Sequence, residues 1–252
     1  MSAIGAASGH RRMRMLQSAW RRGHGYARRF APILVCCVYV ACPPPAQASE
    51  WREAEWDWRA GDLIFRSGLD PLDDLIAQAT RTAFGSVAIV RAGSGAPHVV
   101  YVDPENGVTE TLLDDFISGL GADDYAAYRV RNMADWGQGD SPVSYNALLV
   151  ADGHAADRFR LVGGDAYYGA EMVYLAALGA GVALASPVML SDLAEGHPEI
   201  REAFLTDWQD HPYCTYVASR EGCWDVIKGT AIVTTGGILE SPGLEKLYPL
   251  AE

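Results

Sequence analysis

The chain has 252 residues, of which 49% are hydrophobic and 21% are charged. This composition is typical of a folded domain with its own core and excludes a largely disordered chain. Acidic residues outnumber basic ones by 32 to 20, which argues against a nucleic-acid partner, because a phosphate backbone repels an acidic surface.

The first 48 residues are predicted to be a secretory signal peptide. Seven arginines and no acidic residue precede Ser49, and the apolar run over residues 30–41 is too short to cross a bilayer comfortably. Cleavage is expected after Ala48, at the end of an Ala-x-Ala site. We therefore expect one domain over residues 49–252, in an exported protein, periplasmic or secreted, with no membrane span in the mature chain.

Cleavage would make the protein more acidic. Seven of the 20 basic residues would be removed, leaving 13 against all 32 acidic ones, a formal net charge of −19. Two other modes of export stay open. In the first, Cys42 would anchor a lipoprotein, although Tyr39 fits a lipobox poorly. The arginine pair at 28–29 hints at twin-arginine export, and translation could begin at Met13 or Met15.

The first part of the mature chain is predicted to form mainly strands. The helix at 72–79 has apolar residues at the spacing of one helix face, and Asp70 is placed to cap its first turn. Two runs rich in β-branched residues flank a Gly-rich turn at 93–97 and predict a hairpin. The elements are a strand at 62–65, a helix at 72–79, strands at 86–92 and 98–103, a helix at 111–120 and a strand at 125–131.

Beyond residue 131 the pattern becomes helical. Helices are predicted over 141–159, 165–179, 190–193 and 198–208, and the tail 231–247 adds one short strand and a small helix. Strands followed by helices indicate an α+β domain, with an antiparallel sheet and helices packed on it.

The mature chain would keep two of the five cysteines, Cys214 and Cys223. Two cysteines nine positions apart in an exported chain are expected to form a local disulfide, with two free thiols as the alternative. Because an oxidised sulfur cannot act as a thiolate, neither is a candidate nucleophile.

Five segments of the domain match a known family in order and spacing. They are GDLIF (61–65), SVAIV (86–90), VYVDPENGV (100–108), YYGAEMVY (167–174) and AIVTTGGILESPGLEKL (231–247). Together they resemble the circularly permuted papain-like cysteine hydrolases of the NlpC type, in the YiiX/YebB-like branch. The resemblance covers essentially the whole mature chain and implies a permuted papain-like fold and the activity class of a peptidase or amidase.

The resemblance also implies where the catalytic residues would stand. In that family a cysteine at the start of a helix is the nucleophile, a histidine on a strand is the base, and a third polar residue orients the histidine. These positions fall on Gly169, Ser86 and Val102. Glycine has no side chain to attack a carbonyl, and a serine hydroxyl cannot accept a proton as imidazole does. Asp103 follows the third position but would face the opposite side of the strand.

We therefore expect a catalytically inactive relative, a pseudoenzyme that binds a peptide, a peptidoglycan fragment, a lipid or a partner protein in the envelope. The remaining cleft is expected to be lined by Tyr167, Tyr168, Ala170, Glu171, Asp157 and His154. No cofactor is expected, and no metal, because nothing at zinc-like spacing appears.

Two other functions stay open. The chain could be an active hydrolase of amide or ester bonds in peptidoglycan peptides or lipids, with His154 as a substitute base or Ser86 as a nucleophile. It could also be a structural envelope protein with a filled cleft. An engineered inactive variant would show the same substitutions.

Overall fold

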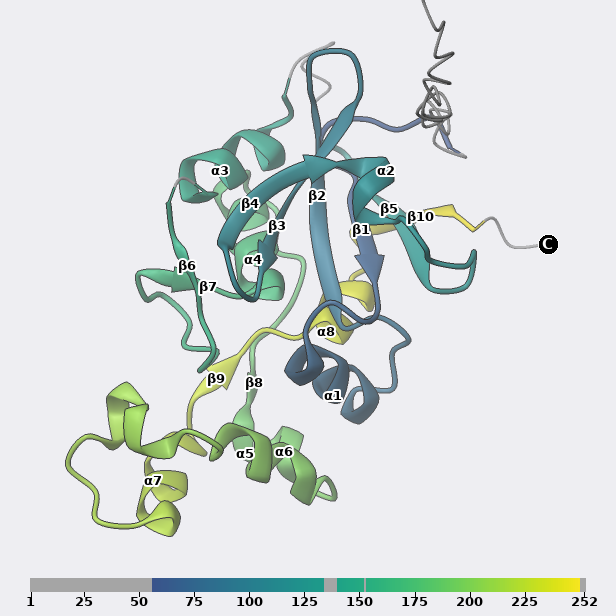
Figure 1. Cartoon of the computed structure of the whole chain (residues 1–252). Coiled ribbons are helices and arrows are strands. Elements are labelled where there is room, and N and C mark those ends of the chain that lie inside the picture. Colours follow the sequence, from purple (N-terminus) through teal and green to yellow (C-terminus); the bar gives the residue numbers. More distant parts are fainter. Residues whose placement is uncertain (1–55, 134–139, 152, 250–252) are drawn as a thin grey trace, which may run out of the picture. The chain divides into compact units, whose positions relative to one another are not determined.

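The computed structural model describes residues 56–133, 140–151 and 153–249 (Figure 1). Together these residues form one compact unit. The predicted signal peptide, its cleavage site and Cys42 lie outside the described residues, so export stays a prediction.

A six-stranded antiparallel sheet is the centre of this unit. Its order is β10-β5-β1-β2-β3-β4, so the last strand in the chain forms one edge of the sheet, beside β5. The strands are β1 (Leu63–Arg66), β2 (Ser86–Ala92), β3 (Pro97–Asp103), β4 (Gly107–Leu112), β5 (Tyr125–Val130) and β10 (Leu244–Tyr248). With helices packed on the sheet, this confirms the α+β fold class.

Different helices cover the two faces of the sheet. Helices α3 (Pro142–Ala151) and α4 (Gly169–Gly179) lie side by side and pack on one face, which includes Val87 and Ile89 (Figure 1). The other face, which includes Ala88, packs against the short helix α2 (Leu113–Phe116). Neighbouring residues of one strand join different clusters because successive side chains point to opposite faces.

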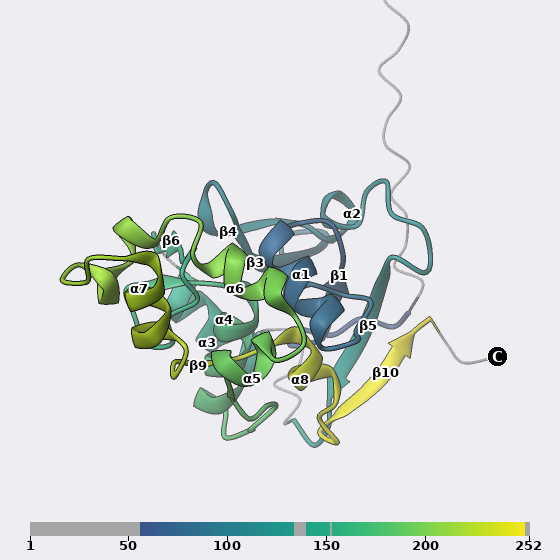
Figure 2. The ribbon, with the colours of Figure 1, turned by 90° about the horizontal axis from the view of Figure 1, so that it is seen from below.

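A second hydrophobic cluster joins the helix α1 (Pro71–Ala79) to the helices near the C-terminus. Those helices are α5 (Leu190–Ala194), α6 (Pro198–Phe204) and α7 (Arg220–Ile227), which Figure 2 shows from below. Cys214 and Cys223 are buried in this cluster and form the expected disulfide, with their Cα atoms 5.1 Å apart.

The capping prediction for α1 is confirmed. The Asp70 carboxylate accepts hydrogen bonds from the backbone N–H of Leu72, at 2.8 Å, and of Asp73, at 3.4 Å. These bonds satisfy two of the four amide donors that a helix start leaves free.

No helix among the described residues has the length and the apolar character needed to cross a membrane.

Several predicted elements differ from the structure. The helix predicted at 111–120 is wrong over its first part, because residues 107–112 pair with β3 as strand β4. The helix predicted at 141–159 ends at Ala151, and Gly153 adopts a left-handed φ of 78° that favours glycine. The patterns also predict neither α7 nor β10.

Small two-stranded pairings complete the fold. Residues Ala155–Ala156 form β6, which pairs in parallel with β7 (Ala166–Tyr167) just before α4. Strands β8 (Val188–Met189) and β9 (Ala231–Ile232) pair antiparallel, and β9 leads into α8 (Thr235–Leu239). The pairing of β6 with β7 matters for the site, because it brings the two ends of the intervening loop together.

Candidate functional site

Helix α4 begins directly against strand β2. Its N-cap residue Tyr168 has an extended backbone and makes no side-chain capping bond. A Cβ atom on Gly169 would lie 3.4 Å from the carbonyl oxygen and 3.8 Å from the nitrogen of Val87, which are ordinary contacts. The backbone of Gly169 is not left-handed. Packing therefore does not require glycine at the position that the resemblance assigns to the nucleophile.

Strand alternation separates Ser86 from the face on which α4 packs. Val87 and Val102 belong to the same hydrophobic cluster as Ala170 of α4. Ser86 pairs with Arg66 of β1 and alternates with Val87, which places it on the opposite face. On β2, Val87 rather than Ser86 is therefore the residue on the α4 side. The Ser86 hydroxyl is buried and has no hydrogen-bond partner within the described part of the chain.

Most of the residues expected to line an open cleft are inside the fold. Tyr168, Ala170, Glu171 and Asp157 are all buried, and the Glu171 side chain is fully enclosed. The Tyr168 hydroxyl accepts a hydrogen bond from the backbone N–H of Val233 at 2.9 Å, and burial raises the pKa of this tyrosine. Tyr168 is therefore a packing residue in this structure.

His154 and Tyr167 lie nearer the surface, at the ends of the loop before α4. Their rings meet edge to face, with centroids 5.0 Å apart. The Nδ1 atom of His154 lies 2.9 Å from the carbonyl oxygen of Asp165. These contacts show His154 holding the loop ends, and among the described contacts none joins its ring to Gly169 or Ser86.

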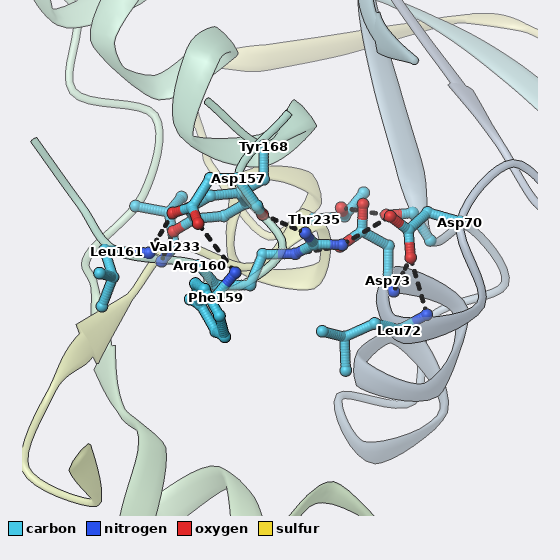
Figure 3. Close-up of polar contacts among 11 residues, drawn as sticks. Asp70, Leu72, Asp73, Asp157, Phe159, Arg160, Leu161, Tyr168, Val233 and Thr235 are labelled. Atoms are coloured by element: carbon cyan, nitrogen blue, oxygen red, sulfur yellow. Dashed lines mark hydrogen bonds and ion pairs between the residues drawn. The ribbon is translucent and has the colours of Figure 1, made fainter. Parts of the chain in front are cut away.

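The loop over residues 157–165, called the strap below, links β6 to β7 and contacts the start of α4. Its shape is set internally by the Asp157 carboxylate, which accepts hydrogen bonds from the backbone N–H groups of Phe159, at 2.8 Å, and Leu161 (Figure 3). Such bonds from an aspartate to amides further along the chain are typical of tight turns. Asp157, which the sequence assigned to the cleft, is therefore a residue that folds the strap.

Arg160 of the strap crosses to helix α1. Its guanidinium lies 2.8 Å from a carboxylate oxygen of Asp70 and 2.8 Å from one of Asp73, and its Cζ atom lies 5.4 Å from the centre of the Tyr168 ring (Figure 3). Burial would lower the pKa of Arg160, but the two carboxylates outweigh burial and raise it. The arginine is therefore charged, and its single positive charge lies between two largely buried carboxylates.

Glu171, in the first turn of α4, makes a second contact with the strap. Its Oε1 atom accepts a hydrogen bond from the backbone N–H of Gly163 at 2.6 Å, while Oε2 is buried with no hydrogen-bond partner among the described residues. Burial raises the pKa of Glu171 to about 7, and the nearby charge of Asp157 acts in the same direction, against the bond from Gly163 and the charge of Arg160. A carboxyl group with this pKa is partly protonated at neutral pH.

Sequence reasoning missed Arg160, which makes most of the polar contacts of this region. It lies outside the five segments that resembled the family, and nothing local distinguishes it from Arg158. Its backbone has a left-handed φ of 57°, which is unusual for a residue with a side chain. That conformation is visible only in the folded chain.

Comparisons with known proteins give one informative result. No family model matches the chain, and no curated protein matches it. A solved structure titled as the metalloprotein yiiX from Escherichia coli O157:H7, DUF1105, superposes with a TM-score of 0.59 at 16% identity, covering 78% of this chain and 100% of that one. This chain has a YiiX-like fold. In the described residues, no group of three or more His, Cys, Asp or Glu side chains is arranged to hold a metal ion.

Proposed function

We propose that this protein is a catalytically inactive relative of the permuted papain-like cysteine hydrolases of the YiiX-like type. In this proposal it acts in the cell envelope by binding a peptide, a cell-wall fragment, a lipid or a partner protein. The observation that carries the proposal is Gly169, the first residue of α4. This residue lies against β2 as a nucleophile at the start of a helix would, yet it offers no atom that could attack a carbonyl.

The surroundings of Gly169 support the same proposal. The residue of β2 on the α4 side is Val87, and the residue of β3 in the same cluster is Val102. Neither can take a proton, and Ser86 lies on the other face of the strand. Loss of the nucleophile and the base together leaves at most residual catalysis by binding effects.

The experiment is to restore the lost groups and measure hydrolysis of a panel of muropeptides and acyl esters. We compare wild type with Ser86→His/Val102→Glu/Gly169→Cys and with Val87→His/Val102→Glu/Gly169→Cys. The second variant places the imidazole on the face that packs against α4. The matched control carries Gly169→Ala in place of Gly169→Cys, since it restores the helix side chain without a thiol.

We expect no turnover by the wild type or the control and turnover by a restored variant, whose substrate would then identify the ligand class. Turnover by the wild type would contradict the proposal. If every restored variant folds, by circular dichroism, and none is active, the proposal of a retained substrate site is wrong.

A structural protein with a filled site is a second candidate. It is favoured by the burial of Tyr168, Ala170 and Glu171, three of the residues expected to line the cleft. Binding and structural functions are separated by a thermal-shift screen of the same muropeptides and esters. A ligand that raises the melting temperature of the wild type supports binding, since only a ligand of the folded state stabilises it.

An active hydrolase based on residues outside the family pattern is the alternative from the enzyme class. Within the first turn of α4, Glu171 is the group with a pKa near neutrality, about 7, which suits a general acid or base. This alternative predicts wild-type turnover that falls in Glu171→Gln. The buried position of the carboxyl group counts against it.

A further inference from the structure

We propose that the strap, residues 157–165, is a closure over the first turn of α4 that Arg160 latches onto Asp70 and Asp73 of α1. The closure would have to open before any molecule reached the start of the helix. This inference goes beyond the proposed function and does not depend on whether α4 ever carried a nucleophile.

The two ends of the strap are fixed close together. Ala155 pairs with Ala166 and Ala156 with Tyr167, and the backbone N–H of Asp157 donates to the Tyr167 carbonyl at 2.8 Å. A loop of nine residues with joined ends is a compact unit, and its base, β6 with β7, is separate from the six-stranded sheet. Opening therefore needs no change in the sheet.

The latch is one buried side chain. The Arg160 side chain is 3% exposed and bonds to Asp70 at 2.8 Å and to Asp73 at 2.9 Å (Figure 3). Its left-handed backbone is a conformation that costs energy for a residue with a Cβ atom and persists only when the surroundings hold it. The side-chain bonds to α1, together with a bond from the guanidinium to the Asp157 carbonyl oxygen, hold it here.

The strap covers α4 through a second, smaller attachment. The backbone N–H of Gly163 donates a hydrogen bond to the Glu171 carboxyl group, and Glu171 has no exposed surface. On either side of this bond the strap faces solvent, since Val162, Gly164 and Asp165 are exposed. The loop thus rests on α4 by few contacts, which is typical of segments that open locally.

The test is hydrogen exchange, read by mass spectrometry on the full chain, in wild type and Asp70→Asn. Asparagine still caps α1, because its side-chain oxygen accepts the same bonds, but it removes one of the two charges that hold Arg160. We expect the amides of the strap and of the first turn of α4 to exchange at least about tenfold faster in the variant. The amides of β2 should be unchanged.

Arg158→Met is the matched control, because Arg158 is on the same strap but is exposed, and the aspartates with which it forms ion pairs are exposed too. Its exchange should equal that of wild type. Arg160→Met should accelerate exchange in the same amides as Asp70→Asn, but more strongly. If Arg160→Met fails to fold, the result for Asp70→Asn decides whether Arg160 latches the strap.

A second readout is the reactivity of a cysteine probe in Gly169→Cys, located by peptide mapping after maleimide labelling. We expect slow labelling at position 169 and at least about tenfold faster labelling when Asp70→Asn is added. Three results would overturn the proposal: rapid labelling with the latch intact, faster exchange in the strap without any change in α4, or equal acceleration in β2.

Discussion

Two arginines stand two residues apart on the strap, and each pairs with two aspartates. Arg158 is 56% exposed, and its partners Asp207 and Asp210 are 55% and 67% exposed. Arg160 is 3% exposed, and the carboxylates it pairs with are 19% and 11% exposed. Water and salt screen the first set of charges, whereas loss of Arg160 from the second set would leave two largely buried carboxylates without their cation.

The comparison shows that the number of ion pairs says little about what a segment does for the fold. The outer side of the strap is solvated, and its exposed ion pairs contribute little to the stability of the fold. The inner side joins α1 to the start of α4, and its energetic weight comes from burial rather than from the attraction between charges alone.

The largest effect is expected for Arg160→Met. This change leaves Asp70 and Asp73 without their cation, and breaking a buried pair by removing one partner typically costs about 3–5 kcal/mol. Urea unfolding measured at pH 7 should show that loss in the free energy of unfolding. A loss below about 1 kcal/mol, the range of surface ion pairs, would mean that the pair is effectively solvated.

The next effect is a pH dependence that Glu171→Gln should remove. The pKa of Glu171 is about 7 in the folded protein against an ordinary 4.5, so the folded state holds this proton more tightly than the unfolded state does. The contribution of Glu171 to stability is therefore present at pH 4.5 and lost as the pH rises to 7, by up to about 3 kcal/mol.

Urea unfolding of both proteins at pH 5 and pH 8 tests this prediction. The wild type should lose more stability than Glu171→Gln over this interval, and Glu171→Gln should be the more stable of the two at pH 8. Parallel profiles would show that the carboxyl group titrates normally in the folded protein.

A smaller effect is expected for Asp70→Asn. The amide keeps the cap of α1 but weakens the bond to Arg160, and losing a hydrogen bond to a charged group costs about 1.5–3 kcal/mol. Thermal unfolding should place this variant between wild type and Arg160→Met. A cost equal to that of Arg160→Met would mean that Asp73 contributes nothing to the pair.

The smallest effect is expected for Arg158→Met, about 0–1 kcal/mol, as for other exposed ion pairs. The small difference from wild type should shrink further in 1 M salt, because screening removes the attraction. A larger cost would show that the outer side of the strap also supports the fold.

Four of the six strands of the sheet, β1, β2, β3 and β5, could be predicted from the sequence because their signal is local. Runs such as Leu63–Arg66 and Ser86–Ala92 carry the β-branched residues that strands favour, and Asp70 marks the start of α1. Strand β10 could not be predicted in the same way. Its sequence LEKLY gains its partner only when the chain returns to β5, more than a hundred residues away.

The site was harder to predict than the fold. The family pattern identified Gly169 as the start of a helix, which the structure confirms, whereas the helix predicted over 165–179 began four residues too early. Alternation along β2 places Val87 instead of Ser86 on the side of that helix. The pairing of Arg160 with Asp70 spans 90 positions, and no local pattern reports a contact of that separation.

The space beside Gly169 has a consequence for how this chain can change. A Cβ atom fits there at ordinary distances from β2, and the backbone angle suits any residue. A glycine codon that ends in a pyrimidine becomes a cysteine codon by one base exchange. With such a codon at position 169, one mutation would place a cysteine there, whereas the base on β2 would have to be built separately.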